Sequence, residues 1–180
     1  MNTFVSYDFV TQIGQEMAFM PEEEAPALVE QMQQEQPALL AYLLASEGYG
    51  LSQEEIEDIF YIGIVVWQIM KRGHPNLRRV SIKQVEQADD ENIKTLEFMR
   101  HDTEADFMSA TMEMIDAYPE PEVLRYIVEA IMEENEDTVD ISDENKGAFF
   151  LVLKTELDAL ILAASRGSKH KSKRLSSNKP

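Results

Sequence analysis

Carboxylates are the only plentiful reactive side chains of this chain, which has 34 Asp+Glu residues, three His and no Cys. Their clearest arrangement stands before a strongly apolar stretch, where Glu54 is followed by Glu55 and Asp58. Residues three apart share one face of a helix, and carboxylate oxygens are the ligands that Mg²⁺ prefers. Glu55 and Asp58 are therefore candidate metal ligands. The alternative is that acids at a helix start only complement the helix dipole.

These acids also carry a resemblance to a known family. The string Glu55-Ile56-Glu57-Asp58, followed by an apolar helix, is similar to the ExxD motif of the all-α NTP pyrophosphatases. The resemblance implies Mg²⁺-dependent hydrolysis of nucleoside triphosphates, with Glu55 and Asp58 holding the metal. That family also has an EExxE motif on the preceding helix. The nearest string here, Glu23-Glu24-Ala25-Pro26-Ala27, lacks the final glutamate and contains a proline. A pyrophosphohydrolase is therefore the alternative interpretation.

No other complete catalytic or metal-binding pattern is present. The sequence has no GxSxG elbow, phosphate-binding glycine loop or dinucleotide fingerprint. The absence of cysteine excludes disulfides and thiolate metal sites. The acidic segment 133–144 does not follow the register of an EF-hand loop, and His101, between Glu97 and Glu104, is expected to be a surface imidazole. We therefore expect no catalytic residue and no cofactor, with Mg²⁺ implied only by the alternative.

The charge of the chain is divided by position. The body, residues 1–165, has 10 bases against 34 acids, a net charge of −24, whereas the segment 166–180 has six bases and no acid. A body this negative repels nucleic acid and anionic membranes and attracts basic partners. The leading hypothesis is a non-catalytic protein-interaction module whose acidic face engages a basic protein. A third hypothesis makes the charge an adaptation to salt, or a solubility device, with no partner.

The basic segment 166–180 is too polar to pack and is expected to be a disordered tail. Its candidate contacts are Arg166, Lys169, Lys171, Lys173 and Arg174. Three interpretations stay open: a solvated extension, a contact with the acidic body, or binding of an external anion such as nucleic acid or lipid headgroups. Because no aromatic residues are interleaved, any nucleic-acid binding would be weak and salt-sensitive.

Caps and periodicity predict an all-α bundle of about eight helices in one domain over residues 1–165. The predicted ranges are about 6–20, 21–36, 37–48, 52–73, 81–101, 103–118, 121–135 and 142–165. The fourth and eighth are apolar on nearly every side and should be central. The β-branched run 62–66 is an alternative strand, but the capping box from Ser52 to Glu55 favours helix.

The two halves of the chain, 1–75 and 81–165, show a possible internal duplication. Residues 37–44 match 121–128 in their proline, leucine and tyrosine, and Ser52 and Phe60 align with Ser142 and Phe150. Two related halves would bring the fourth and eighth helices together at the centre, where Gly63 would allow close approach. Chance similarity of amphipathic helices is the alternative.

The location of the protein is expected to be cytoplasmic. The densest apolar run, residues 59–70, is shorter than the roughly 20 residues that a membrane-spanning helix needs. The first residues lack the basic and apolar regions of a secretory signal. No membrane partner is therefore expected, and the sequence leaves the oligomeric state open.

Overall fold

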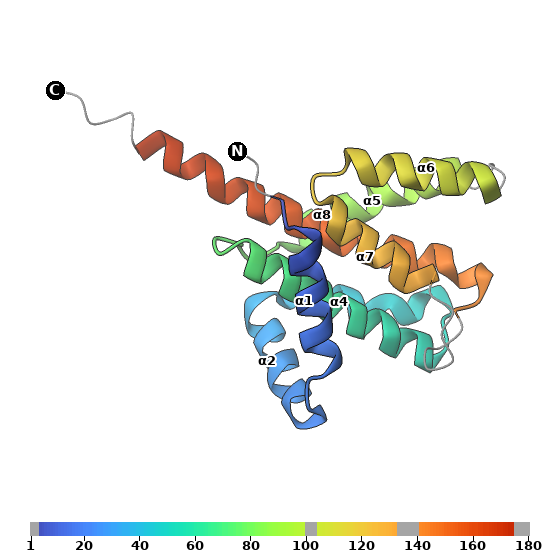
Figure 1. Ribbon diagram of the computed structural model, residues 1–180, viewed down its shortest axis with the longest axis horizontal. Helices are drawn as coiled ribbons and strands as arrows, with labels where there is room; N and C mark the ends of the chain where they lie inside the picture. Colours follow the sequence, from blue (N-terminus) through green and yellow to red (C-terminus); the bar gives the residue numbers. More distant parts are fainter. Residues whose placement is uncertain (1–3, 100–103, 133–140, 175–180) are drawn as a thin grey trace.

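The structure is a computed structural model that describes residues 4–99, 104–132 and 141–174. Within these ranges it has eight α-helices and no strand (Figure 1), which confirms the predicted all-α bundle and the helical conformation of residues 62–66. The elements are α1 (Tyr7–Ala18), η1 (Glu22–Glu24), α2 (Ala25–Glu35), α3 (Pro37–Leu44), η2 (Ala45–Tyr49), α4 (Gln53–Gly73), α5 (Ile82–Met99), α6 (Glu104–Ala117), α7 (Pro121–Met132) and α8 (Asp143–Arg174). Here η denotes a 3₁₀ helix.

Local hydrogen bonds explain why these helices begin where they do. The predicted capping box at α4 is present, because the Ser52 backbone N–H donates to Glu55 Oε2 at 2.8 Å and the Glu55 N–H donates to Ser52 Oγ at 3.2 Å. Ser81 and Gln84 make the same exchange at the start of α5. Each box satisfies backbone donors that the first turn leaves free. Gly50, with φ of 76°, makes the left-handed turn that separates η2 from α4.

Helix α8 runs through the middle of the bundle and packs against α4, α5 and α7 (Figure 1). Both predicted central helices carry fully buried side chains: Trp67 on α4 and Phe149 on α8 are 0% exposed. The prediction that the fourth and eighth helices are central is thus confirmed. Their N-terminal ends lie together, and the two helices run in the same direction, whereas α5 runs antiparallel to α8.

The helix contacts repeat between the two predicted halves. Suppose that each helix of the first half is exchanged with its counterpart four helices later, so that α1 takes the place of α5. The contact between α1 and α4 then corresponds to the contact between α5 and α8. Likewise, the contact of α3 with α4 corresponds to that of α7 with α8, and the contact of α3 with α5 to that of α7 with α1. The α4–α8 contact maps onto itself. This pattern is the one expected of halves related by a pseudo-two-fold axis between the central helices. The duplication itself stays a prediction.

Helix α8 is longer than predicted. Its backbone remains helical to Arg174, nine residues beyond the expected end at Ser165, so residues 166–174 form helix where disorder was expected. In Figure 1 this end of α8 projects beyond the other helices. Residues 175–180 lie outside the described ranges.

Of the helices in the described chain, none has a stretch that is both long and apolar enough to cross a membrane.

Candidate functional site

Glu55, the first candidate metal ligand, joins the two central helices. Its side chain is buried, with the residue 5% exposed, and both carboxylate oxygens lie 2.9 Å from Asn145 Nδ2 on α8. Burial by itself raises the pKa of Glu55, but the hydrogen bonds from Asn145, Ser52 and Ser142 outweigh it and hold the pKa below its usual value. This carboxylate is ionised and fully engaged with the protein, as a structural link between two helix starts.

Asp58, the second candidate ligand, has a different environment. It is partly buried one turn after Glu54. Burial, and then the negative charges of Glu54, Glu57 and Glu55, raises its pKa. The carboxylates therefore repel one another. In the described part of the chain, no three His, Cys, Asp or Glu side chains are grouped so that they could hold a metal ion.

The acids at this end of the bundle come from two helices. Glu54 and Glu57 are exposed on α4, Asp58 is partly buried beside them, and Glu144 is exposed in the first turn of α8, next to the Asn145–Glu55 contact. We call these four residues the acidic pole. Within the described chain, none of them forms an ion pair. The pole lies at the N-terminal ends of two parallel helices, where helix dipoles favour negative charge.

Bases gather at the C-terminal end of α4 and in the segment that follows it. The segment 71–85 contains five bases and no acid, and the last acid of α8 is Asp158. Lys71 and Arg72 pair with Glu35 at 2.7 Å and Glu16 at 2.6 Å, but Arg78, Arg79 and Lys83 are exposed. Acids of α1 and α2 therefore lie beside the bases at this end of α4.

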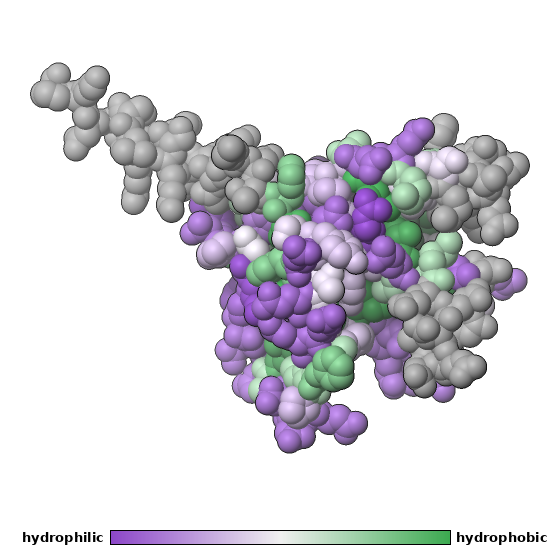
Figure 2. Space-filling view, in the orientation of Figure 1, coloured by the Kyte–Doolittle hydropathy of each residue, from purple (hydrophilic) through white to green (hydrophobic). Residues whose placement is uncertain are grey.

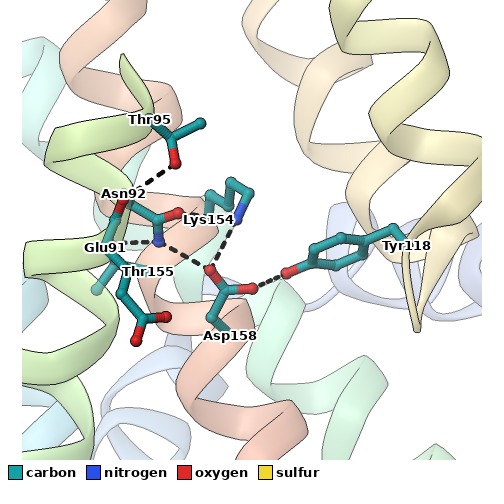
Figure 3. A network of polar contacts seen from close by, with 7 residues as sticks. All are labelled: Glu91, Asn92, Thr95, Tyr118, Lys154, Thr155 and Asp158. Carbon is teal, nitrogen blue, oxygen red and sulfur yellow. Dashed lines mark hydrogen bonds and ion pairs between the residues drawn. The ribbon is translucent and has the colours of Figure 1, made fainter. Parts of the chain in front are cut away.

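A network of polar side chains lies farther along α8 (Figure 3). Lys154 Nζ donates to Asn92 Oδ1 and to Asp158 Oδ2, both at 2.8 Å, and lies 5.2 Å from the centroid of the Tyr118 ring. Asn92 Nδ2 also donates to Asp158 Oδ2 at 2.8 Å, and the Tyr118 hydroxyl donates to Asp158 Oδ1. The network thereby joins α5 and α8 to the connection after α6.

This network neutralises its own charge. Lys154 is 9% exposed and Asn92 is 6% exposed, so their polar groups need partners inside the protein. Burial, and then the charge of Asp158, raises the pKa of Tyr118, which keeps its phenol protonated as a donor. The ammonium group, the carboxylate and the amide are all engaged with one another. We interpret the network as a clamp that fixes the orientation of α5 on α8.

Glu156 is the one fully buried carboxylic acid among the described side chains. It is 0% exposed, and neither oxygen has a hydrogen-bond partner. Burial raises its pKa well above the ordinary value, which favours the neutral form of the group. It lies against Gly63 of α4, where a Cβ atom would come within 2.9 Å of Oε2. The missing side chain at residue 63 leaves space for the side chains of Glu156 and Leu43, and a close approach of the helices there stays a prediction.

A histidine–glutamate pair attaches the N-terminal segment to the bundle. His74 Nε2 lies 2.8 Å from Glu120 Oε1, and the backbone N–H of Val5 donates to Glu120 Oε2 at 2.9 Å. Glu120 is buried before the start of α7. The pair therefore links three distant parts of the chain. His101 and the acids of 133–140 lie outside the described residues.

Comparison with known proteins gives no relative: no protein family, curated protein or solved structure matches this chain. Function must therefore be inferred from the geometry. Sequence patterns did not reveal the network around Lys154 or the buried Glu156. The available signal was the presence of Lys154, Glu156 and Asp158 within one turn of an otherwise apolar helix. Polar residues there must be paired, neutral or at an edge of the core.

Proposed function

We propose that this protein is a non-catalytic interaction module whose acidic pole binds a basic protein segment. The observation that carries the proposal is that the start of α4, with Glu54, Glu57 and Asp58, lies at the same end of the bundle as the start of α8, which carries Glu144. Burial, and then the negative charges of the neighbouring acids, raises the pKa of Asp58 there. A Lys- or Arg-rich segment would relieve that repulsion, so complementary charge would speed and orient its association.

Figure 2 shows hydrophilic residues over much of one face of the molecule, with hydrophobic residues among them. The neighbour of the acids along α4 supports a charged ligand. On α4, the residue exposed one turn beyond the acids is Tyr61, at 43% exposure. A tyrosine ring beside carboxylates can receive an arginine or lysine through a cation–π contact. The proposed ligand is therefore a short basic segment rather than an apolar helix.

The alternative of Mg²⁺-dependent hydrolysis has less support. It requires Glu55 as a metal ligand, whereas the carboxylate of Glu55 accepts hydrogen bonds from Ser52 and Asn145. Freeing it for a metal would break both the cap of α4 and the link to α8. No specific observation favours a nucleotide site at this end of the bundle.

The proposal is tested with a fluorescein-labelled nona-arginine peptide and the full chain, by fluorescence anisotropy at several salt concentrations. We expect binding that weakens as salt rises, because the contact is between exposed charges. The variant E54Q/E57Q/E144Q should lose most of this affinity. The matched control E30Q/E91Q/E113Q removes the same charge from exposed sites on α2, α5 and α6.

The comparison of these two variants separates a site from a general charge effect. If both triple variants weaken peptide binding equally, only net charge matters and the acidic pole is not the site. If neither the wild-type protein nor the control binds the peptide, the proposed function is wrong. The fold of each variant is checked by circular dichroism, since the pole's acids also complement the dipoles of two helices.

A further inference from the structure

The chain before α5 and the chain before α1 are built alike. In both, a buried valine stands directly before an exposed serine: Val5 before Ser6, and Val80 before Ser81. Each serine Oγ accepts a backbone N–H of the first turn of its helix, at 3.3 Å in both cases. Each valine N–H donates to the side chain of the residue before the proline that opens α7 or α3. The two serines therefore have equivalent backbone settings.

Only one of these two serines has arginines before it. Arg78 and Arg79 stand three and two residues before Ser81, and both are exposed. Arg79 also donates to the backbone oxygen of Gln34 at the end of α2. The two positions at the same distances before Ser6 carry no charge. Because the same kind of helix start forms without bases at α1, the cap of α5 does not explain the paired arginines.

Paired arginines upstream of an exposed serine hydroxyl form the charge pattern that basophilic protein kinases recognise. Carboxylates in the substrate groove of such an enzyme bind guanidinium groups through charge-assisted hydrogen bonds. Residues 74–81 form the non-helical connection between α4 and α5, so the arginines and the hydroxyl lie on irregular chain at the surface. Val80 between them is buried. Access therefore requires local opening at the start of α5, and helix ends open more readily than helix centres.

We propose that Ser81 is a phosphorylation site, the acceptor residue for a basophilic serine/threonine kinase. The γ-phosphoryl group of a nucleoside triphosphate moves to Ser81 Oγ. The new O–P bond forms as the bond to the oxygen of the β-phosphate breaks, which leaves a nucleoside diphosphate, and the hydroxyl proton passes to the catalytic carboxylate of the kinase. This inference is independent of the proposed function, because the acidic pole takes no part in it.

The fold can accept the phosphate group. Ser81 Oγ donates to Gln84 Oε1 at 2.9 Å and accepts the N–H of the same residue. Phosphorylation removes that donor, but the phosphate oxygens remain acceptors for the N–H. The segment 78–85 contains three bases and no acid, so a phosphate of about two negative charges lowers its net charge from +3 to about +1. The modification changes the local charge without removing the cap of α5.

Phosphorylation is tested on the full chain with the catalytic subunit of cyclic-AMP-dependent protein kinase and Mg·ATP, and the site is read by peptide mass spectrometry. Ser176 and Ser177, outside the described residues, also follow bases in the sequence, so every protein carries S176A/S177A. The test variant is R78Q/R79Q. The matched control K83Q/K94Q removes the same charge from exposed sites on α5. Circular dichroism checks that each variant is folded.

The expected product carries one phosphate, on Ser81, and none on Ser6. R78Q/R79Q should lower kcat/KM for Ser81 by about tenfold or more, because hydrogen bonds to charged groups are lost in the complex with the kinase. The control K83Q/K94Q should change kcat/KM by less than about twofold, since its bases stand after the serine. A synthetic peptide of residues 75–87 should be modified at least as fast as the folded chain.

Four results would overturn the proposal. The first is a folded chain in which Ser81 stays unmodified while the peptide is phosphorylated, because the fold then hides the site. The second is a peptide that the kinase does not modify. The third is phosphate on Ser6 at a rate comparable to that on Ser81. The fourth is an equal effect of the two double variants, which would show that the upstream arginines do not direct the kinase.

Discussion

Gly63 of α4 and Glu156 of α8 lie in direct contact at the centre of the bundle, where a Cβ atom on residue 63 would come within 2.9 Å of Glu156 Oε2. The same atom would lie 2.7 Å from Leu43 Cδ1. A side chain at residue 63 would therefore require the side chains of Leu43 and Glu156 to shift. The carboxyl group of Glu156, which is fully buried and has no hydrogen-bond partner, thus lies against the backbone of α4 at Gly63.

Gly63→Ala is expected to destabilise the protein by about 1–3 kcal/mol, because the added methyl group overpacks the α4–α8 contact. Gly14→Ala is the matched control. A Cβ at residue 14 would meet Tyr126 Cε2 at 3.7 Å, an ordinary contact. That substitution should stabilise α1 by about 0.5–1 kcal/mol through helix propensity. Urea denaturation measures both, and equal effects of the two substitutions would contradict the close approach.

Glu156→Gln is expected to change the pH dependence of stability. Because the pKa of Glu156 is raised in the folded state, its neutral form stabilises the fold fully below the unfolded pKa, and this stability is lost as pH rises toward the folded pKa. Each pH unit in that interval costs about 1.4 kcal/mol. Glu156→Gln should therefore become more stable, relative to wild type, as the pH rises from acidic to neutral.

The control for this experiment is Glu129→Gln, at an exposed position on α7. It should leave the shape of the stability–pH curve nearly unchanged. The amide introduced by Glu156→Gln can itself lack a partner and lower stability by about 1–3 kcal/mol. That penalty is the same at every pH, so only the pH-dependent difference is diagnostic. A constant difference between wild type and Glu156→Gln would show that Glu156 is not buried in its neutral form.

Glu55→Ala should lower stability by about 2 kcal/mol or more, because it removes the cap of α4 and leaves Asn145 without its carboxylate partner. Glu54→Ala, one residue earlier and exposed, should cost well under 1 kcal/mol.

Thermal melts with and without Mg²⁺ also test the hydrolase alternative. A wild-type melting temperature that rises with Mg²⁺, in a manner lost in Glu55→Ala, would restore Glu55 as a metal ligand.

Lys154→Met should destabilise the protein by about 3 kcal/mol, since it leaves Asp158 and Asn92 without the ammonium group that joins them. The double variant Lys154→Met/Asp158→Leu should recover part of this loss. A double-mutant cycle measured by denaturation gives the coupling, with about 0.5–3 kcal/mol expected for side chains in contact. Strict additivity of the two single effects would mean that the clamp contributes nothing as a unit.

The helices were predictable because their causes are local. The serine caps at residues 52 and 81, the turn at Gly50 and the apolar runs of α4 and α8 all act within a few residues of sequence. Helix periodicity also correctly placed α4 and α8 in the centre. The end of α8 was missed, because its polar and basic residues signal the end of a packed surface and not the end of a helix.

The sequence by itself determined which segments are helical, which two are central, and that negative and positive charge are separated along the chain. Only the tertiary structure decided what the charged side chains do. Glu55 contacts Asn145, which is 90 residues away, and Glu156 lies against Gly63 of α4. The parallel packing of α4 and α8 brings acids that are distant in the sequence to the same end of the bundle. A capping bond needs one turn of helix, whereas the pairing, burial and position of a charge depend on neighbours that only folding brings together.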